Sequence, residues 1–245
     1  MAPTNYKTVF RVEYKPTLDF YDKMFSIASA LPGYPDWFTT GLSITLQNLD
    51  AWCSFSLAHN FFTYIRDMKE EEAQGGDDKR VRAILETVAS KLEKKEYQRV
   101  GLRCWFLNSV EMSFDNLVSL VSERFLAQSE EIKEGICPKA TDLAYVVHFM
   151  DNNLKVQLRA GPMRRDEIEQ HFQPDRNANL PPKKRGLPAE ELFSGFPEVS
   201  LLMDIDVSKK DAKHEELAQV YANAQKVQSK LSQNIVRYVF GLKEK

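Results

Sequence analysis

Two aspartates near the C-terminal end of the chain are the clearest candidates for chemistry. Asp204 and Asp206 lie two residues apart in the apolar stretch 199–207, which reads Val-Ser-Leu-Leu-Met-Asp-Ile-Asp-Val. Residues two apart in a strand point to the same face, so the two carboxylates would lie side by side. Such a pair could bind a divalent cation through oxygen ligands, and a cation-dependent enzyme is one function that it could serve.

Arg103 gives the same aspartates a structural interpretation. Residues 97–110 predict a second strand, in which Arg99 and Arg103 share a face. If the two strands are neighbours, Arg103 would form an ion pair with Asp204 or Asp206 across the sheet. We favour this interpretation, and we predict neither a metal site nor a catalytic residue.

The other reactive residue types lack the spacing that chemistry would need. No histidine stands beside a serine or cysteine in a nucleophile motif, and the glycines at 75–76 lack the strand and the Lys-Ser/Thr of a phosphate loop. The three cysteines are widely spaced, without a C-x-x-C motif, and are typical of reduced thiols in a cytoplasmic protein. We therefore expect no cofactor.

Residues 173–198 form a proline-rich, basic segment. Each proline removes a backbone hydrogen-bond donor, so the segment is a poor core element, and we predict an exposed arm or loop. Its cluster of three basic residues, Lys183-Lys184-Arg185, suits an acidic surface of another protein. The residues that we expect to contact this partner are Lys183, Lys184, Arg185, Phe193 and Phe196.

Composition argues against two classes of partner. Lysine and arginine number 33 against 35 acidic residues, a net charge of −2, so no whole-chain excess attracts nucleic acid. The amino terminus lacks the apolar region of a signal peptide, and no apolar stretch is long enough to span a membrane. We expect a cytoplasmic protein that binds neither nucleic acid nor a membrane.

Hydrophobic periodicity predicts the elements that position these residues. Strands are expected at 6–15, 42–49, 52–65, 97–110, 143–150, 154–160 and 199–207, with a loop at 34–41, a polar exposed connection at 68–79 and a charged break at 208–214. Helices are expected at 18–31, 81–96, 113–125, 164–172 and 217–242. This order favours a single α+β domain over 1–245, a curved and largely antiparallel sheet that helices cover on one face. Two ferredoxin-like halves are the alternative.

The long C-terminal helix closes the hydrophobic layer in this interpretation. A small-ligand pocket between it and the sheet is a second functional hypothesis. We expect its lining to include Trp52, Trp105, Phe149 and Tyr238.

Two short motifs resemble a known family. Residues 97–103 resemble the R-x-G-L-R-Y strand, and 202–207 the L-D-I-D ending, of a sporadically distributed bacterial family of uncharacterised proteins. Residues 104–108, Cys-Trp-Phe-Leu-Asn, depart from the aromatic and Asn-Arg pair that the family places there. The family has no agreed activity, and its distribution is similar to that of genes in mobile or defence loci, including CRISPR-associated accessory genes. The resemblance implies a bacterial accessory protein, and our leading hypothesis is a non-enzymatic module that binds and modulates another protein.

Overall fold

A computed structural model describes residues 3–48, 50–67, 76–125, 141–172 and 195–242 of the chain. Over this part, nine strands form one open sheet in the order β2-β3-β4-β5-β1-β6-β9-β8-β7, and every neighbouring pair is antiparallel. The strands are β1 (Thr4–Glu13), β2 (Asp36–Thr40), β3 (Ser43–Asn48), β4 (Cys53–Ala58), β5 (Phe61–Arg66), β6 (Glu96–Ser109), β7 (Tyr145–Asp151), β8 (Leu154–Arg164) and β9 (Val199–Lys213). The predicted antiparallel α+β fold is confirmed, with one sheet in place of two ferredoxin-like halves.

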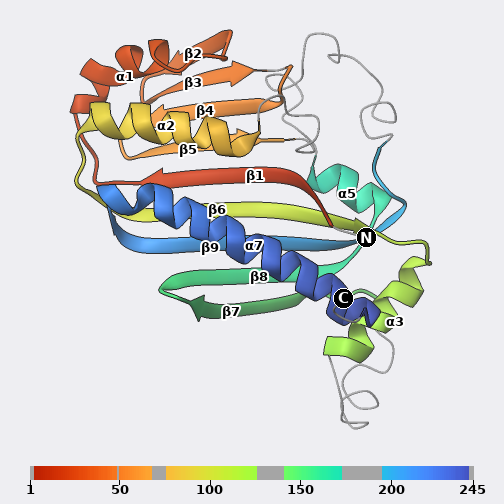
Figure 1. The fold of residues 1–245 in the computed structure, drawn as a ribbon. Coiled ribbons are helices and arrows are strands. Elements are labelled where there is room, and N and C mark those ends of the chain that lie inside the picture. The colour runs from red at the N-terminus through yellow and green to blue at the C-terminus, as the bar shows by residue number, and fades with distance from the viewer. Residues whose placement is uncertain (1–2, 49, 68–75, 126–140, 173–194, 243–245) are drawn as a thin grey trace.

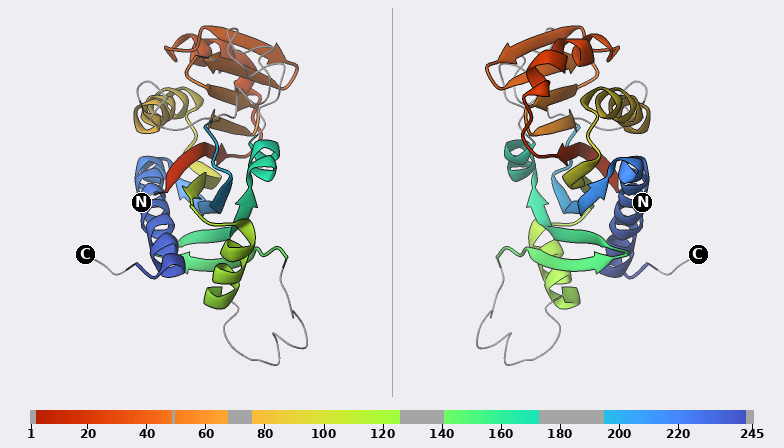
Figure 2. Two further views of the ribbon diagram at one scale, coloured as in Figure 1. Left: turned by 90° about the vertical axis from the view of Figure 1, so that its right-hand side faces the viewer. Right: turned by 90° about the vertical axis from the view of Figure 1, so that its left-hand side faces the viewer.

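Helices α1 (Asp19–Ser29), α2 (Asp77–Leu92) and α7 (Leu217–Phe240) lie over one face of this sheet. Helix α3 (Phe114–Phe125) packs beside β8 and the end of α7, and α5 (Arg165–His171) lies on the opposite face (Figures 1 and 2). Among the described residues, none of the helices combines the length and the apolar character needed to cross a membrane.

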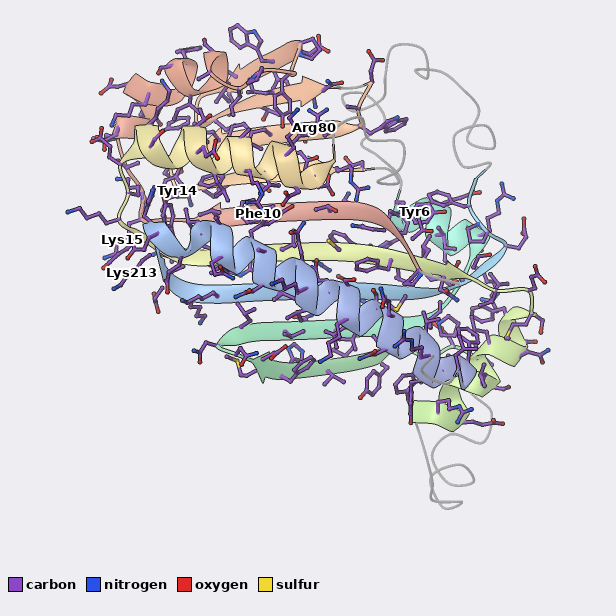
Figure 3. The ribbon with its side chains drawn as sticks, in the orientation of Figure 1. Tyr6, Phe10, Tyr14, Lys15, Arg80 and Lys213 are labelled. Atoms are coloured by element: carbon purple, nitrogen blue, oxygen red, sulfur yellow. The ribbon has the colours of Figure 1, made fainter. Side chains whose placement is uncertain are left out.

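Alternation along the strands explains why the layers form. In β1 the alternate residues Thr8, Phe10 and Val12 are buried on one face, and Phe10 lies between α2 and α7 (Figure 3). The same face of β6 and β9 carries Leu102, Cys104, Met203 and Ile205, all buried. Helices that cover this apolar face remove it from water.

Helix α7 is the longest of the described helices, as predicted, and Gly241 ends it in the left-handed conformation at φ 64°. Its buried face differs from the predicted stripe, because Tyr238 is 53% exposed while Val239 is buried. The Gln228 side-chain amide links α7 to the central strands β6 and β9, because it donates to the carbonyls of Leu102 (2.8 Å) and Ile205 (2.9 Å).

Three predicted boundaries were wrong. The expected loop at 34–41 contains the edge strand β2, and the single strand expected at 52–65 is two strands joined at His59 and Asn60. No break occurs at 208–214 either, since β9 continues to Lys213 with Asp211 at φ 51°. Backbone pairing with β6 extends to Glu96 and Lys213, so the charged side chains there do not end the strand.

Candidate functional site

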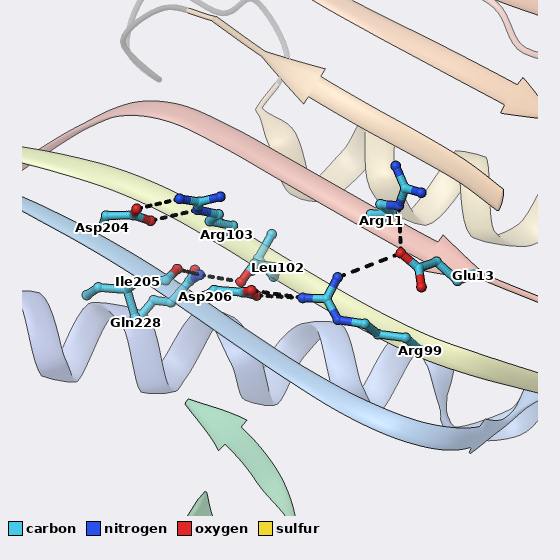
Figure 4. A network of polar contacts seen from close by, with 9 residues as sticks. All are labelled: Arg11, Glu13, Arg99, Leu102, Arg103, Asp204, Ile205, Asp206 and Gln228. Carbon is cyan, nitrogen blue, oxygen red and sulfur yellow. Dashed lines mark hydrogen bonds and ion pairs between the residues drawn. The ribbon is translucent and has the colours of Figure 1, made fainter. Parts of the chain in front are cut away.

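A row of charged side chains crosses the sheet face that α1, α2 and α7 leave uncovered. The strand register places Glu13 opposite Arg99, and Arg103 opposite Asp206, with Asp204 on the same face. Figure 4 shows these groups as two neighbouring sets of ion pairs, Arg103 with Asp204 and the row Arg11, Glu13, Arg99 and Asp206. The central strands β1, β6 and β9 supply them, so a rigid backbone positions the network.

Arg103 and Asp204 form a two-pronged ion pair. The Nε and Nη2 groups of Arg103 donate to the two Asp204 oxygens at 2.8 and 2.6 Å. The guanidinium also lies over the Trp105 ring, 4.5 Å from its centroid. Hydrogen bonding to Asp204 raises the pKa of Arg103. These contacts fix the direction of the guanidinium, as cation–π and bidentate contacts do elsewhere.

Asp206 pairs with a different arginine, although Arg103 lies opposite it in the register. Arg99 Nη2 donates to both Asp206 oxygens at 3.1 and 2.8 Å, and Glu13 links Arg99 (3.9 Å) to Arg11 (2.8 Å). Burial raises the pKa of the Asp206 carboxyl, and the positive charges of Arg99 and Arg103 oppose that shift. Both aspartates proposed as cation ligands are thus already engaged by guanidinium groups.

A pocket of about 410 Å³ adjoins this network, between α5 and the start of the β7–β8 hairpin. Arg103, Arg159, Glu167, His171 and Asp204 contribute its charged or titratable walls, together with Asp142. Gly161 lets the backbone at Leu143 approach β8 closely, because a Cβ at this position would clash with the Leu143 carbonyl oxygen.

A small apolar cluster supports α5 at the end of this face. Tyr6 lies beside α5 (Figure 3) and packs with Trp105, Ile168 and Phe172. Phe196, predicted as an exposed partner contact, is half-buried here, with its ring 5.2 Å from Tyr6 and 5.9 Å from Phe172. This corrects its expected exposure: an aromatic ring beside two others is removed from water at little cost. The other predicted contacts, Lys183, Lys184, Arg185 and Phe193, lie outside the described residues.

The sequence interpretation missed a buried ion pair between Arg66 and Asp77. Arg66 is fully buried, Asp77 is 4% exposed, and Arg66 Nε donates to both Asp77 oxygens at 2.9 Å. Tyr64 also donates to Asp77 (2.8 Å), and Arg66 donates to the Thr8 hydroxyl (2.9 Å). The connection predicted as exposed over 68–79 therefore contains a buried residue, Asp77, at the start of α2, while Asp78 and Lys79 are exposed as predicted. Strand alternation offered a signal, since Arg66 shares the inward face with Phe62 and Tyr64.

A pocket also exists between α7 and the sheet, with a volume of about 240 Å³. The expected lining residues are wrong. Trp105 lies on the opposite face of the sheet, and Tyr238 is exposed and donates to the Arg124 carbonyl at 2.8 Å. Neither Trp52 nor Phe149 lines the pocket, whose walls include Thr8, Asp77, Cys104, Tyr221, Gln225, Gln228, Ser229 and Ser232.

The outermost strand β2 carries a second exposed feature. All five of its residues are exposed, Trp37 to 59% and Phe38 to 46%. Phe25 of α1 lies edge-on to Trp37 at 6.2 Å and is itself half exposed. Large exposed apolar groups on an edge strand are typical of a contact surface.

No protein-family model matches this chain, and no curated protein matches it significantly. The described surfaces are therefore the basis for a functional assignment. They define an α+β protein with one helix-covered face, one charged open face and an aromatic sheet edge.

Proposed function

We propose that this protein is a non-enzymatic accessory module that binds another protein by pairing an extended partner segment with β2. The exposure of all five β2 residues at the outer edge of the sheet carries the proposal. An edge strand presents N–H and C=O groups that a further strand can pair with, and its side chains then select the partner.

The sequence of β2 lacks residues that usually prevent another strand from pairing with a sheet edge. Natural sheets usually shield an edge with lysine, proline or a bulge. The sequence Asp-Trp-Phe-Thr-Thr contains neither residue, and its pairing with β3 is regular from Asp36 to Thr40. The opposite edge is partly covered, because Tyr145 of β7 stacks on Phe125 of α3 at 4.4 Å.

The proline-rich arm at 173–198 is a second proposed contact with the partner, on the strength of its sequence alone. A bacterial defence locus is the proposed setting, and it rests on the two motifs at 97–103 and 202–207. The two contacts together would bind the partner more tightly than either alone, since linked contacts raise the effective concentration of each.

Replacing Phe38 with lysine should abolish partner binding without unfolding the protein. Phe38 is 46% exposed on the sheet face opposite α1, α2 and α7, so a lysine there stays solvated while blocking strand addition. The measurement is quantitative mass spectrometry of proteins that co-purify with the tagged full-length chain from its native host.

Val146→Lys is the matched control, because Val146 is 51% exposed on the same face of the other edge strand. We expect a partner to be retained by the wild type and by Val146→Lys, and lost from Phe38→Lys. The proposal would be contradicted if Phe38→Lys co-purified with the same proteins, in the same amounts, as the wild type.

A small-ligand-binding domain is the second candidate, because a pocket does lie between the sheet and α7. Hydroxyl and amide groups line much of it, including Thr8, Gln225 and Ser229, which suits a neutral hydrogen-bonding ligand. Native mass spectrometry of the purified chain should then show a bound mass that Ser229→Leu, which fills the pocket, displaces. This candidate would be removed if the wild-type protein showed no bound mass, both as purified from cells and after incubation with a metabolite extract.

A further inference from the structure

We infer that the pocket between α5 and the β7–β8 hairpin binds a small molecule through an oxyanion group, a phosphate or a carboxylate, with Arg159 as the principal anchor. This site lies on the sheet face opposite α1, α2 and α7, where α5 forms one of its walls, and it is separate from the β2 edge. The inference is therefore independent of the proposed protein partner.

Arg159 is a cation whose charge is not compensated locally. Its side chain is exposed and lines the pocket, and among the described residues it forms no ion pair or hydrogen bond. Asp204 lies opposite it in the register but bonds to Arg103 instead. Guanidinium groups bind carboxylate and phosphate through paired N–H donors, so Arg159 can accept an anion without breaking an existing contact.

Arg103 provides a second donor that is already oriented. Asp204 engages its Nε and Nη2, while Trp105 supports the plane of the guanidinium from one side. The remaining Nη1 group makes no hydrogen bond or ion pair within the part of the chain that the structure describes, and its side chain lines the pocket. A donor held in place loses little conformational entropy when a ligand binds.

The acidic walls of the pocket do not cancel this preference. Glu167 is committed to Arg164, because one oxygen accepts from the Arg164 backbone N–H at 2.7 Å and the other lies 3.7 Å from its guanidinium. Asp142 is exposed and accepts from the Leu143 backbone N–H at 2.7 Å. Each of these carboxylates thus has a local donor, whereas none of the acidic residues that the structure describes forms an ion pair with Arg159.

His171 makes the site sensitive to pH. Its ring lies edge-on to Trp105 at 6.4 Å, and it lines the pocket beside Glu167 and Gln170 of its own helix. Burial lowers the pKa of His171 from 6.5; Asp204 opposes that shift, and the positive charges of Lys7, Arg103 and Arg159 add to it. The ring is therefore neutral at neutral pH, and protonation at lower pH adds a positive charge beside the anion.

The test is a titration of the full-length chain with sulfate, whose charge is constant through the neutral and mildly acidic range. Isothermal calorimetry and the NMR shift of the Trp105 indole N–H report binding. Arg159→Gln should weaken binding by about tenfold or more, as expected for loss of a charge-assisted contact. Phosphate and succinate, titrated in parallel, distinguish a tetrahedral oxyanion from a carboxylate.

Lys155→Gln is the matched control, because Lys155 is exposed on the same face of the same strand but does not line the pocket. It should leave the affinity unchanged, and Arg159→Lys should retain part of it. Affinity should rise as the pH falls below 6.5, and His171→Gln should flatten that dependence. Absence of binding by all three anions, or equal loss with Lys155→Gln and Arg159→Gln, would overturn the inference.

Discussion

Asp77→Ala should lower the free energy of unfolding by about 3–5 kcal/mol, the largest effect that we expect from a single charged residue of this protein. Asp77 is 4% exposed and accepts from Arg66 and Tyr64. Its removal leaves the Arg66 guanidinium fully buried without a counter-charge. The desolvation of that charge, which Asp77 compensates in the folded protein, then opposes folding. Urea denaturation followed by circular dichroism measures the loss.

The neighbouring residue offers a matched control. Asp78 also lies in the first turn of α2, but its ion pair with Arg82 is exposed to solvent. Asp78→Ala should therefore change stability little, because water and salt screen exposed pairs. A similar loss from Asp77→Ala and Asp78→Ala would show that position in the helix, rather than burial, determines the effect.

A double variant separates the buried charge from the rest of the effect. In Arg66→Met with Asp77→Leu, both charges are replaced by apolar groups, so neither is left unpaired. This variant should recover much of the stability that Asp77→Ala loses. Failure to recover would indicate that the hydrogen bonds to Tyr64 and Thr8 stabilise the fold more than the charge compensation does.

The sheet and its long terminal helix were predictable because their signals are periodic. Alternation placed β1, β6 and the β7–β8 hairpin, and the turn at Asn152 and Asn153 has the positive φ values that asparagine tolerates (46° and 68°). Spacing in the two motif strands also anticipated Arg103 beside Asp204, once the strands were taken as neighbours.

Other features depend on contacts that no local pattern encodes. Strand β2 has five residues, all exposed, so burial leaves no alternating signature in its sequence. Asp77 lies at the end of a charged, glycine-containing stretch, and its burial depends on Arg66 approaching from β5. The pocket at α5 combines residues from β6, β8, β9 and α5, so its lining appears only when the strand order is known.

Phe10→Ala should lower the free energy of unfolding by about 3–5 kcal/mol, through loss of packing rather than of charge. Phe10 is fully buried on β1, with its ring edge-on to Tyr221 of α7 at 5.2 Å and 6.4 Å from Phe62. Truncation opens a cavity where the central sheet meets α7, and the surrounding strands, paired on both sides, can collapse only in part.

Val9→Ala tests whether this loss belongs to the helix-covered face. Val9 is the adjacent residue of the same strand, half-buried on the face that carries Arg103, so its truncation should cost clearly less. Urea denaturation compares the free energies of unfolding of the two variants.

Sulfate binding by the pocket at Arg159 is measured under conditions where both variants are folded. We expect Phe10→Ala to retain this binding, because Phe10 and Arg159 lie on opposite faces of the sheet. Equal losses of stability from Phe10→Ala and Val9→Ala would contradict the expectation. They would mean that packing against α7 stabilises β1 no more than packing on the opposite face of the sheet does.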